Sequence, residues 1–251
     1  MIRFNLLILF IFFSISPTYS ATLPDTIDKI RHSVVGVGTY NKLSSPRATL
    51  LGTGFAIHNG RYVATNAHVV PKELKKSQKE KLVIFIRENN KVATYVANLV
   101  TRDDTHDLAI LKLENKKLPP FSISGKTVRE GELYAFTGFP IGAILGLYPV
   151  THRGIISSIT PIAIPARNVK ELTTAQLKRL KKPYFIYQLD ATAYPGNSGS
   201  PVYDPATGQV IAVINKTFVK QSKEAVLTDP SAITYAIPVQ YLNDLLKKAL
   251  N

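Results

Sequence analysis

Twelve short segments rich in Val, Ile, Tyr, Phe and Thr recur along the chain, and they constrain its fold more than any other feature. The segments are Val34–Tyr40, Gly52–Ile57, Tyr62–Thr65, Leu82–Ile86, Val92–Val100, Leu108–Leu113, Leu133–Phe139, Pro149–Thr160, Tyr184–Leu189, Pro201–Tyr203, Val210–Phe218 and Ala232–Ile237. Turn residues separate them, as in His58–Arg61 and Asp204–Gly208. These residue types favour strands, and many short, evenly spaced strands predict a barrel or a sandwich rather than alternating strands and helices.

The strand segments fall into two sets of six, and the stretch Lys117–Thr127, which contains two adjacent prolines, separates the sets. Because proline is rarely found inside a sheet, this stretch is a natural connection between two units. We therefore predict an all-β chain made of two six-stranded barrels, at about 28–118 and about 128–237.

The end of the chain carries a different periodicity. From Pro238 onward, apolar residues recur at helical spacing, and Lys247 and Lys248 lie where the last turn would be. Proline suits the first helical position, and cations suit the carboxyl end of the helix dipole. The pattern predicts a C-terminal helix over 238–249 that packs on the barrels, and a shorter helix is expected over 173–182.

The first twenty residues have the pattern of a secretory signal. Arg3 provides a short positive region, the apolar run Leu6–Phe13 follows, and Pro17 and small residues precede a cleavage site predicted after Ser20. A membrane-spanning helix needs roughly 20 apolar residues, and this run is much shorter. We expect a mature domain over 21–251 with no transmembrane segment.

The chain has no cysteine, which together with an export signal suits a bacterial periplasmic or secreted protein. A domain of roughly 230 residues can fold on core packing without disulfides. The 251 residues carry a net charge of +14. The basic excess gathers in two clusters, Lys72, Lys75, Lys76, Lys79 and Lys81, and Lys170, Lys178, Arg179, Lys181 and Lys182.

A basic surface attracts anionic lipid, nucleic acid or acidic substrates. No nucleic-acid motif accompanies the charge, and no aromatic residues that could stack on bases are interleaved with the lysines. We expect no nucleic-acid partner, and we interpret both clusters as solvated loops.

A serine flanked by glycines is the strongest indication of chemistry in the sequence. Ser198 lies in Gly196-Asn197-Ser198-Gly199, and the glycines permit a tight turn that exposes the hydroxyl. Backbone N–H groups of Gly196 and Ser198 can converge on one point, where a developing oxyanion would be held. The alternative is a glycine-rich turn with an incidental serine.

A serine hydroxyl needs a base to act as a nucleophile. We propose His68, which follows a predicted strand, as that base, and Asp107, which directly precedes another strand, as the carboxylate that orients the imidazole. Asp103 and Asp104 are rivals to Asp107, and we expect them and His106 to be solvated turn residues.

These motifs resemble the chymotrypsin superfamily, in which the order is also His, Asp, Ser, and within it the protease domain of the HtrA (Deg) family. The matching pieces are Gly52–Phe55, Thr65–Val70, Asp107–Leu111, Gly154–Ser157 and Gln188–Gly199. The resemblance implies a chymotrypsin-like pair of antiparallel barrels with the active site in the cleft between them. It also implies a serine endopeptidase that acts on proteins or peptides through an acyl-enzyme, with no metal and no cofactor.

The chain also departs from these relatives. It ends about fifty residues after Ser198, so we expect no PDZ domain. Asn197 stands where zymogen-activated trypsins have an aspartate, so we expect no activation by insertion of a new N-terminus. Ser200 gives the nucleophile turn a likeness to bacterial glutamyl endopeptidases, but Val210–Lys216 lacks the histidine that those enzymes use.

The resemblance places the lining of the primary specificity pocket at Thr192, Ala193, Tyr194, Val213, Ile214 and Asn215. No acid stands where trypsins have theirs, so a small or medium apolar side chain is expected before the scissile bond. A different class of function stays open, namely a binding or chaperone-like protein that retains the protease fold and recruits an anionic partner through its basic surface.

Overall fold

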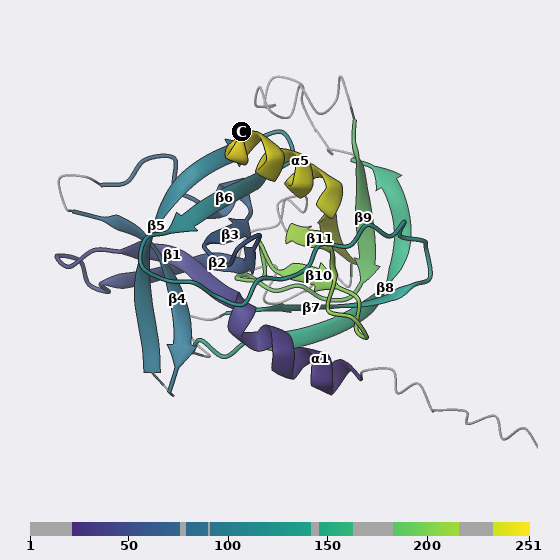
Figure 1. Cartoon of the computed structure of the whole chain (residues 1–251), viewed down its shortest axis with the longest axis horizontal. Coiled ribbons are helices and arrows are strands. Elements are labelled where there is room, and N and C mark those ends of the chain that lie inside the picture. The colour runs from purple at the N-terminus through teal and green to yellow at the C-terminus, as the bar shows by residue number, and fades with distance from the viewer. Residues whose placement is uncertain (1–21, 76–78, 90, 142–145, 163–182, 216–232) are drawn as a thin grey trace, which may run out of the picture.

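A computed structural model describes residues 22–75, 79–89, 91–141, 146–162, 183–215 and 233–251. The predicted signal, the predicted helix over 173–182 and the second lysine cluster lie outside these residues. Within them, the strands close into two antiparallel barrels that lie side by side (Figure 1).

Barrel one is formed by the first six strands. They are β1 Val34–Tyr40, β2 Ala48–Ile57, β3 Tyr62–Thr65, β4 Lys81–Glu88, β5 Lys91–Asp103 and β6 Leu108–Leu113. Their order around the barrel is β1-β2-β3-β6-β5-β4. The 3-10 turn η2, Ala67–Val69, follows β3 after one residue, Asn66.

Barrel two is formed by the last six strands. They are β7 Leu133–Gly138, β8 Val150–Pro161, β9 Phe185–Asp190, β10 Pro201–Tyr203, β11 Val210–Asn215 and β12 Ile233–Pro238. Their order is β10-β11-β12-β9-β8-β7. The prediction of two six-stranded barrels is therefore confirmed.

Strand positions agree closely with those predicted from the sequence, and the largest differences lie at strand ends. β2 begins at Ala48 rather than at Gly52, because hairpin pairing with β1 continues as far as Tyr40 opposite Ala48. β5 likewise extends to Asp103, which pairs with Leu108 of β6. Most residues at these ends are polar or exposed, so their backbone pairing leaves little hydrophobic pattern in the sequence.

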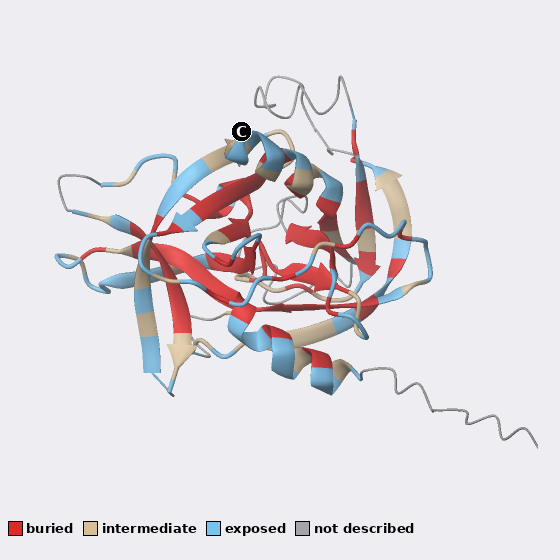
Figure 2. Ribbon diagram, in the orientation of Figure 1, coloured by how far each residue is buried: buried red, intermediate tan, exposed pale blue. Residues whose placement is uncertain are grey.

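One hydrophobic cluster joins the barrels. It contains Phe55 and Ile110 of barrel one, Ala135 and Val213 of barrel two, and Leu242 of the C-terminal helix. Figure 2 shows buried residues concentrated inside the barrels and between them. Since each fully buried aliphatic side chain contributes roughly 1.5–3 kcal/mol, this shared core fixes how the barrels meet.

Two helices lie outside the barrels. The predicted C-terminal helix is confirmed as α5, Val239–Leu250, although Pro238 ends β12 and is the residue before the helix rather than its first residue. The sequence did not indicate α1, Leu23–Ile30, which begins with a capping box between Thr22 and Asp25. No helix in the described part of the chain is long and apolar enough to cross a membrane.

Candidate active site

The turn that carries Ser198 requires glycine on both sides. Gly196 has φ of 100° and Gly199 has φ of 88°, conformations that side chains rarely adopt. A Cβ at Gly196 would lie 2.2 Å from the carbonyl oxygen of Phe139, and one at Gly199 would lie 2.0 Å from that of Thr53. The backbone is therefore packed too closely for any other residue.

Thr53 of β2, a strand of barrel one, holds this turn by hydrogen bonds. The N–H of Thr53 donates to the Ser198 carbonyl at 2.8 Å, and the Thr53 hydroxyl donates to the Gly196 carbonyl at 2.7 Å. The same hydroxyl accepts from the N–H of Phe139 at 3.0 Å. Thr53 thus fixes a barrel-two turn to the wall of barrel one.

His68 and Asp107 form a close pair. The imidazole Nδ1 of His68 lies 2.7 Å from Oδ2 of Asp107, and the His68 backbone N–H donates to Oδ1 at 2.9 Å. Asp107 has φ of 54°, a left-handed conformation that aspartate tolerates better than most residues. Its carboxylate is buried, whereas the imidazole is about one-third exposed at 33%.

The structure also brings Ser198 and the His68 turn to one place. A Cβ on Gly52 would lie 2.7 Å from Cγ2 of Val69, the neighbour of His68, and 2.9 Å from the Ser198 carbonyl oxygen. Gly52 is therefore the point where η2 and the serine turn meet.

Asn66 and Asn215 contribute contacts that the sequence did not indicate. The Nδ2 group of Asn215 donates to Asp107 Oδ2 at 2.7 Å, and that of Asn66 donates to the Asp107 carbonyl oxygen at 3.1 Å. Both asparagines are fully buried. Asn215 was expected to line the specificity pocket. Its amide contacts the Asp107 carboxylate, an orientation that a strand pattern does not reveal.

The peptide between Pro195 and Gly196 has a fixed orientation. The N–H of Ile141 donates to the Pro195 carbonyl at 2.7 Å, and a trans peptide directs its own N–H to the opposite side. In the described part of the chain, the N–H groups of Gly196 and Ser198 have no hydrogen-bond acceptor.

The expected pocket residues do not all face the same part of the core. Ala193 and Ile214 belong to the barrel-two core, whereas Val213 belongs to the cluster between the barrels. Thr192 and Tyr194 are partly exposed.

His152 of β8 also borders this region, which the sequence did not suggest. Its ring stacks on Phe136 at 4.9 Å, and its centroid lies 6.3 Å from that of Tyr194. Burial lowers the pKa of His152 below its usual 6.5.

The expectation that the residues before Asp107 are solvated holds only in part for Asp103 and His106, whose side chains are 26% and 23% exposed. Asp103 Oδ2 lies 2.6 Å from His106 Nδ1, and His106 stacks on Tyr241 of α5 at 4.2 Å. Hydrogen bonds to Asp103 from His106 hold the pKa of that carboxyl below its usual value, against the opposing effect of burial. Asp104 is exposed, as expected.

Two closed six-stranded antiparallel barrels that share a core and a C-terminal helix define the chymotrypsin-like class of proteins. The sequence profile of the trypsin-like peptidase domain matches residues 52–213, a range that includes His68, Asp107 and Ser198. The chain belongs to this family, and the relatives that it resembles include proteases of the HtrA type.

Named relatives come from bacteria and from a vertebrate. A "probable periplasmic serine endoprotease DegP-like" of Halomonas elongata is 26% identical over 80% of this chain and 35% of its own length. "Serine protease HTRA1" of Xenopus tropicalis is 27% identical over 94% of this chain and 45% of its own length. The chain therefore spans less than half of either relative. A serine endoprotease from Yersinia pestis has the same fold, with a TM-score of 0.62 and 23% identity over 91% of this chain and 66% of that one.

Proposed function

We propose that the protein is a serine endopeptidase, with Ser198 as nucleophile, His68 as general base and Asp107 as orienting carboxylate. The observation that carries the proposal is the Asp107 carboxylate, which contacts both the backbone and the ring of His68 beside the turn of Ser198. The bond at Nδ1 leaves Nε2 as the atom that can accept the serine proton. The names of the relatives agree with this activity.

The reaction then has two halves. Ser198 Oγ attacks the scissile carbonyl carbon while His68 Nε2 takes the hydroxyl proton, and His68 returns that proton to the leaving amine as the carbon–nitrogen bond breaks. Water attacks the resulting acyl-enzyme in the same way and releases the acid. The N–H groups of Gly196 and Ser198 would stabilise the oxyanion in each half, and losing one such donor typically costs about 10²–10³ in rate.

We also propose that the residue before the scissile bond is small or medium-sized and apolar. Ala193 and Ile214 are buried apolar neighbours just beside the serine turn, and an unpaired charge against such a surface would be unfavourable. Thr192 and Tyr194 would complete the lining. A peptide library should therefore be cleaved after valine, alanine or leucine in preference to glutamate, lysine or arginine. Lys216, which could pair with an acidic side chain, lies outside the described residues.

A fluorophosphonate probe tests the activity directly. We expect labelling of Ser198, identified by mass spectrometry, together with cleavage of unfolded casein, and loss of both in Ser198→Ala. Ser157→Ala, which removes an exposed serine on β8, is the matched control and should be labelled and active. A protein that is folded, is not labelled and still binds unfolded casein would favour the binding or chaperone-like alternative.

We further propose that the protein is exported, as the relatives named periplasmic suggest. The mature chain should begin near Ala21 and be active without further processing. N-terminal sequencing of active, exported protein tests this. A start well beyond Ser33, with inactivity of longer forms, would reveal a pro-segment.

A further inference from the structure

Strands β4 and β5 separate before barrel one ends. Their pairing stops at Val83 opposite Val96. Toward its start β4 remains paired only with β1, and from Ala97 onward β5 is paired only with β6. Among the described residues, no strand pairs with the edge of β5 that β4 has left. Such an edge presents backbone groups that an added strand can bind.

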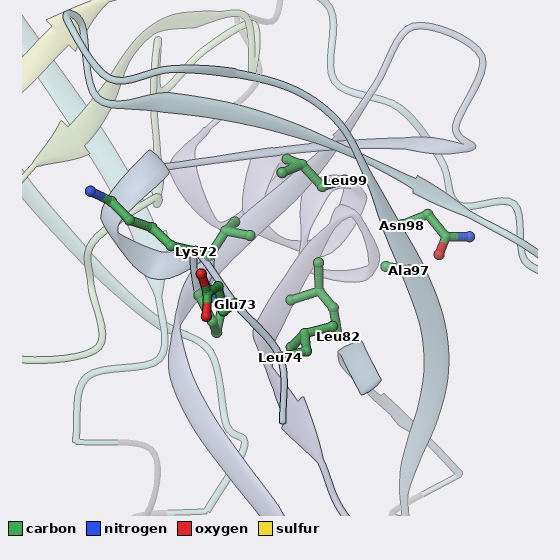
Figure 3. Close-up of a pocket in the computed structure, with 9 residues that line it drawn as sticks. Lys72, Glu73, Leu74, Leu82, Ala97, Asn98 and Leu99 are labelled. Carbon is green, nitrogen blue, oxygen red and sulfur yellow. The ribbon is translucent and has the colours of Figure 1, made fainter. Parts of the chain in front are cut away.

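A pocket of about 570 Å³ lies where the two strands separate, and we call it the β4–β5 opening. Its residues come from the segment 70–74, from Leu82 of β4 and from Ala97–Leu99 of β5. Figure 3 shows Leu74, Leu82 and Leu99 around the same space. This volume is in the range of sites that hold a ligand.

The floor and rim of the opening are apolar. Val70, Leu82 and Ala97 are buried members of the barrel-one core, so an entering side chain would reach that core. Leu99, at the rim, is 44% exposed. An exposed leucine beside an open strand edge favours a partner that supplies both an aliphatic side chain and an extended backbone.

The charges around the opening favour an acidic partner. Lys72 lines it, and Lys75 and Lys81, which adjoin the lining residues Leu74 and Leu82 in sequence, are exposed. Glu73 is the acidic lining residue, and the nearby Glu80 accepts a hydrogen bond from the Lys75 backbone N–H at 2.9 Å. The cationic side chains named here outnumber the acidic ones.

The opening is also connected to the candidate active site. The segment 70–74 begins two residues after His68, and Arg102 of β5 donates to the Val70 carbonyl at 3.0 Å. A polypeptide that lies across His68 can therefore continue along this segment.

We propose that the β4–β5 opening binds an extended, acidic segment of the protein substrate, remote from the scissile bond. A large aliphatic side chain of that segment enters between Leu82 and Leu99, its backbone adds to the free edge of β5, and its carboxylates pair with Lys72 and its neighbours. This inference rests on the proposed peptidase function and adds a substrate class to it.

The test uses synthetic fluorogenic peptides that share one cleavable sequence. One peptide is short, and others carry Asp-Glu-Leu-Asp-Leu-Glu through a flexible linker at either end; in matched peptides Lys replaces Asp and Glu. With the wild-type protein, we expect an acidic extension at one end to lower KM about tenfold relative to the short peptide, and the lysine extension to have no such effect.

Leu99→Glu and the double variant Lys72→Glu/Lys75→Glu should each abolish this tenfold gain. Neither should change kcat or KM for the short peptide. Leu133→Glu, which alters a leucine of β7 that is 47% exposed, is the matched control and should keep the gain. Fluorescence anisotropy of the labelled acidic segment alone gives a readout that does not depend on catalysis, and binding should be lost in Leu99→Glu.

The possible failures are distinguishable. No cleavage of any peptide and no fluorophosphonate labelling would overturn the proposed function. Cleavage of the short peptide without a gain from either acidic extension, or a gain that persists in Leu99→Glu, would overturn only the β4–β5 opening as a substrate site. A wild-type dimer in sedimentation that Leu99→Glu dissociates would identify the opening as an interface between copies, and would also overturn the proposal.

Discussion

Asn215 Nδ2 lies 2.7 Å from Oδ2 of Asp107, the same carboxylate oxygen that lies 2.7 Å from Nδ1 of His68. One oxygen is therefore shared by an amide from barrel two and an imidazole from barrel one. Asn215 is fully buried at the end of β11, where it pairs with Tyr235 of β12. Barrel two thus supplies the serine turn and also contacts the carboxylate that is bonded to the His68 imidazole.

Replacing Asn215 should lower turnover rather than substrate binding. In Asn215→Leu the buried carboxylate loses a donor, which typically costs about 1–3 kcal/mol, so kcat should fall roughly 10- to 100-fold with KM nearly unchanged. Asn59→Leu, at an exposed asparagine of the turn between β2 and β3, is the control. Steady-state kinetics on a short peptide distinguishes the two roles of Asn215. A raised KM with normal kcat would indicate that Asn215 lines the specificity pocket.

The choice of Asp107 over its neighbours can be tested in the same assay. Asp107→Asn keeps the size of the side chain but favours the wrong tautomer of His68, and in a triad this change costs about 10⁴-fold in kcat. Asp104→Asn, at the exposed neighbour that contacts Arg102, should be within a fewfold of wild type. Full turnover in Asp107→Asn together with an inactive Asp104→Asn would reverse the assignment.

The sequence predicted the barrels because hydrophobic alternation and turn residues are local features. β1, β3, β6 and β10 have the bounds that their residues suggest. The helix α1 was missed, since its capping box and its Pro24 are weaker signals than a hydrophobic stripe.

The candidate site was predictable only as motifs. Local sequence indicates that Ser198 lies on a tight turn, but not that Thr53 holds this turn from the other barrel. The roles of Asn66, Asn215 and His106 depend on contacts between distant segments. Such contacts become visible only when the strands are placed in their register.

Stability measurements on glycine variants can separate the cost of an unfavourable backbone conformation from the cost of steric crowding. Gly125 has open space and no positive φ, so Gly125→Ala should leave the unfolding free energy almost unchanged. Gly131 has φ of 84° and open space, so Gly131→Ala should cost about 1–2 kcal/mol through conformation alone. Gly199→Ala adds a Cβ 2.0 Å from the Thr53 carbonyl and should cost more, with loss of activity.

Urea denaturation of the three alanine variants checks this order. Equal losses at Gly131 and Gly199 would mean that the serine turn moves away from Thr53 at little cost. In that case the turn would not be held as tightly as its hydrogen bonds indicate.

His152 should make the fold sensitive to acid. Burial lowers the pKa of its imidazole below 6.5, so the unfolded chain binds this proton more readily than the folded protein does. The unfolding free energy contributed by this group is therefore complete above about pH 6.5 and is lost progressively as the pH falls from there toward the lower folded pKa. In the described part of the chain, Nε2 of His152 has no hydrogen-bond partner that could offset the cost of protonation.

His152→Phe, which preserves an aromatic ring against Phe136, should remove this component of acid sensitivity. Urea denaturation at pH 8 and pH 5 should show a smaller fall in unfolding free energy for His152→Phe than for wild type. The control is His58→Asn, at an exposed histidine whose φ of 57° asparagine tolerates, and it should follow the wild-type curve. Identical pH dependence in wild type and His152→Phe would show that the imidazole reaches water or a partner when protonated, and would contradict the prediction.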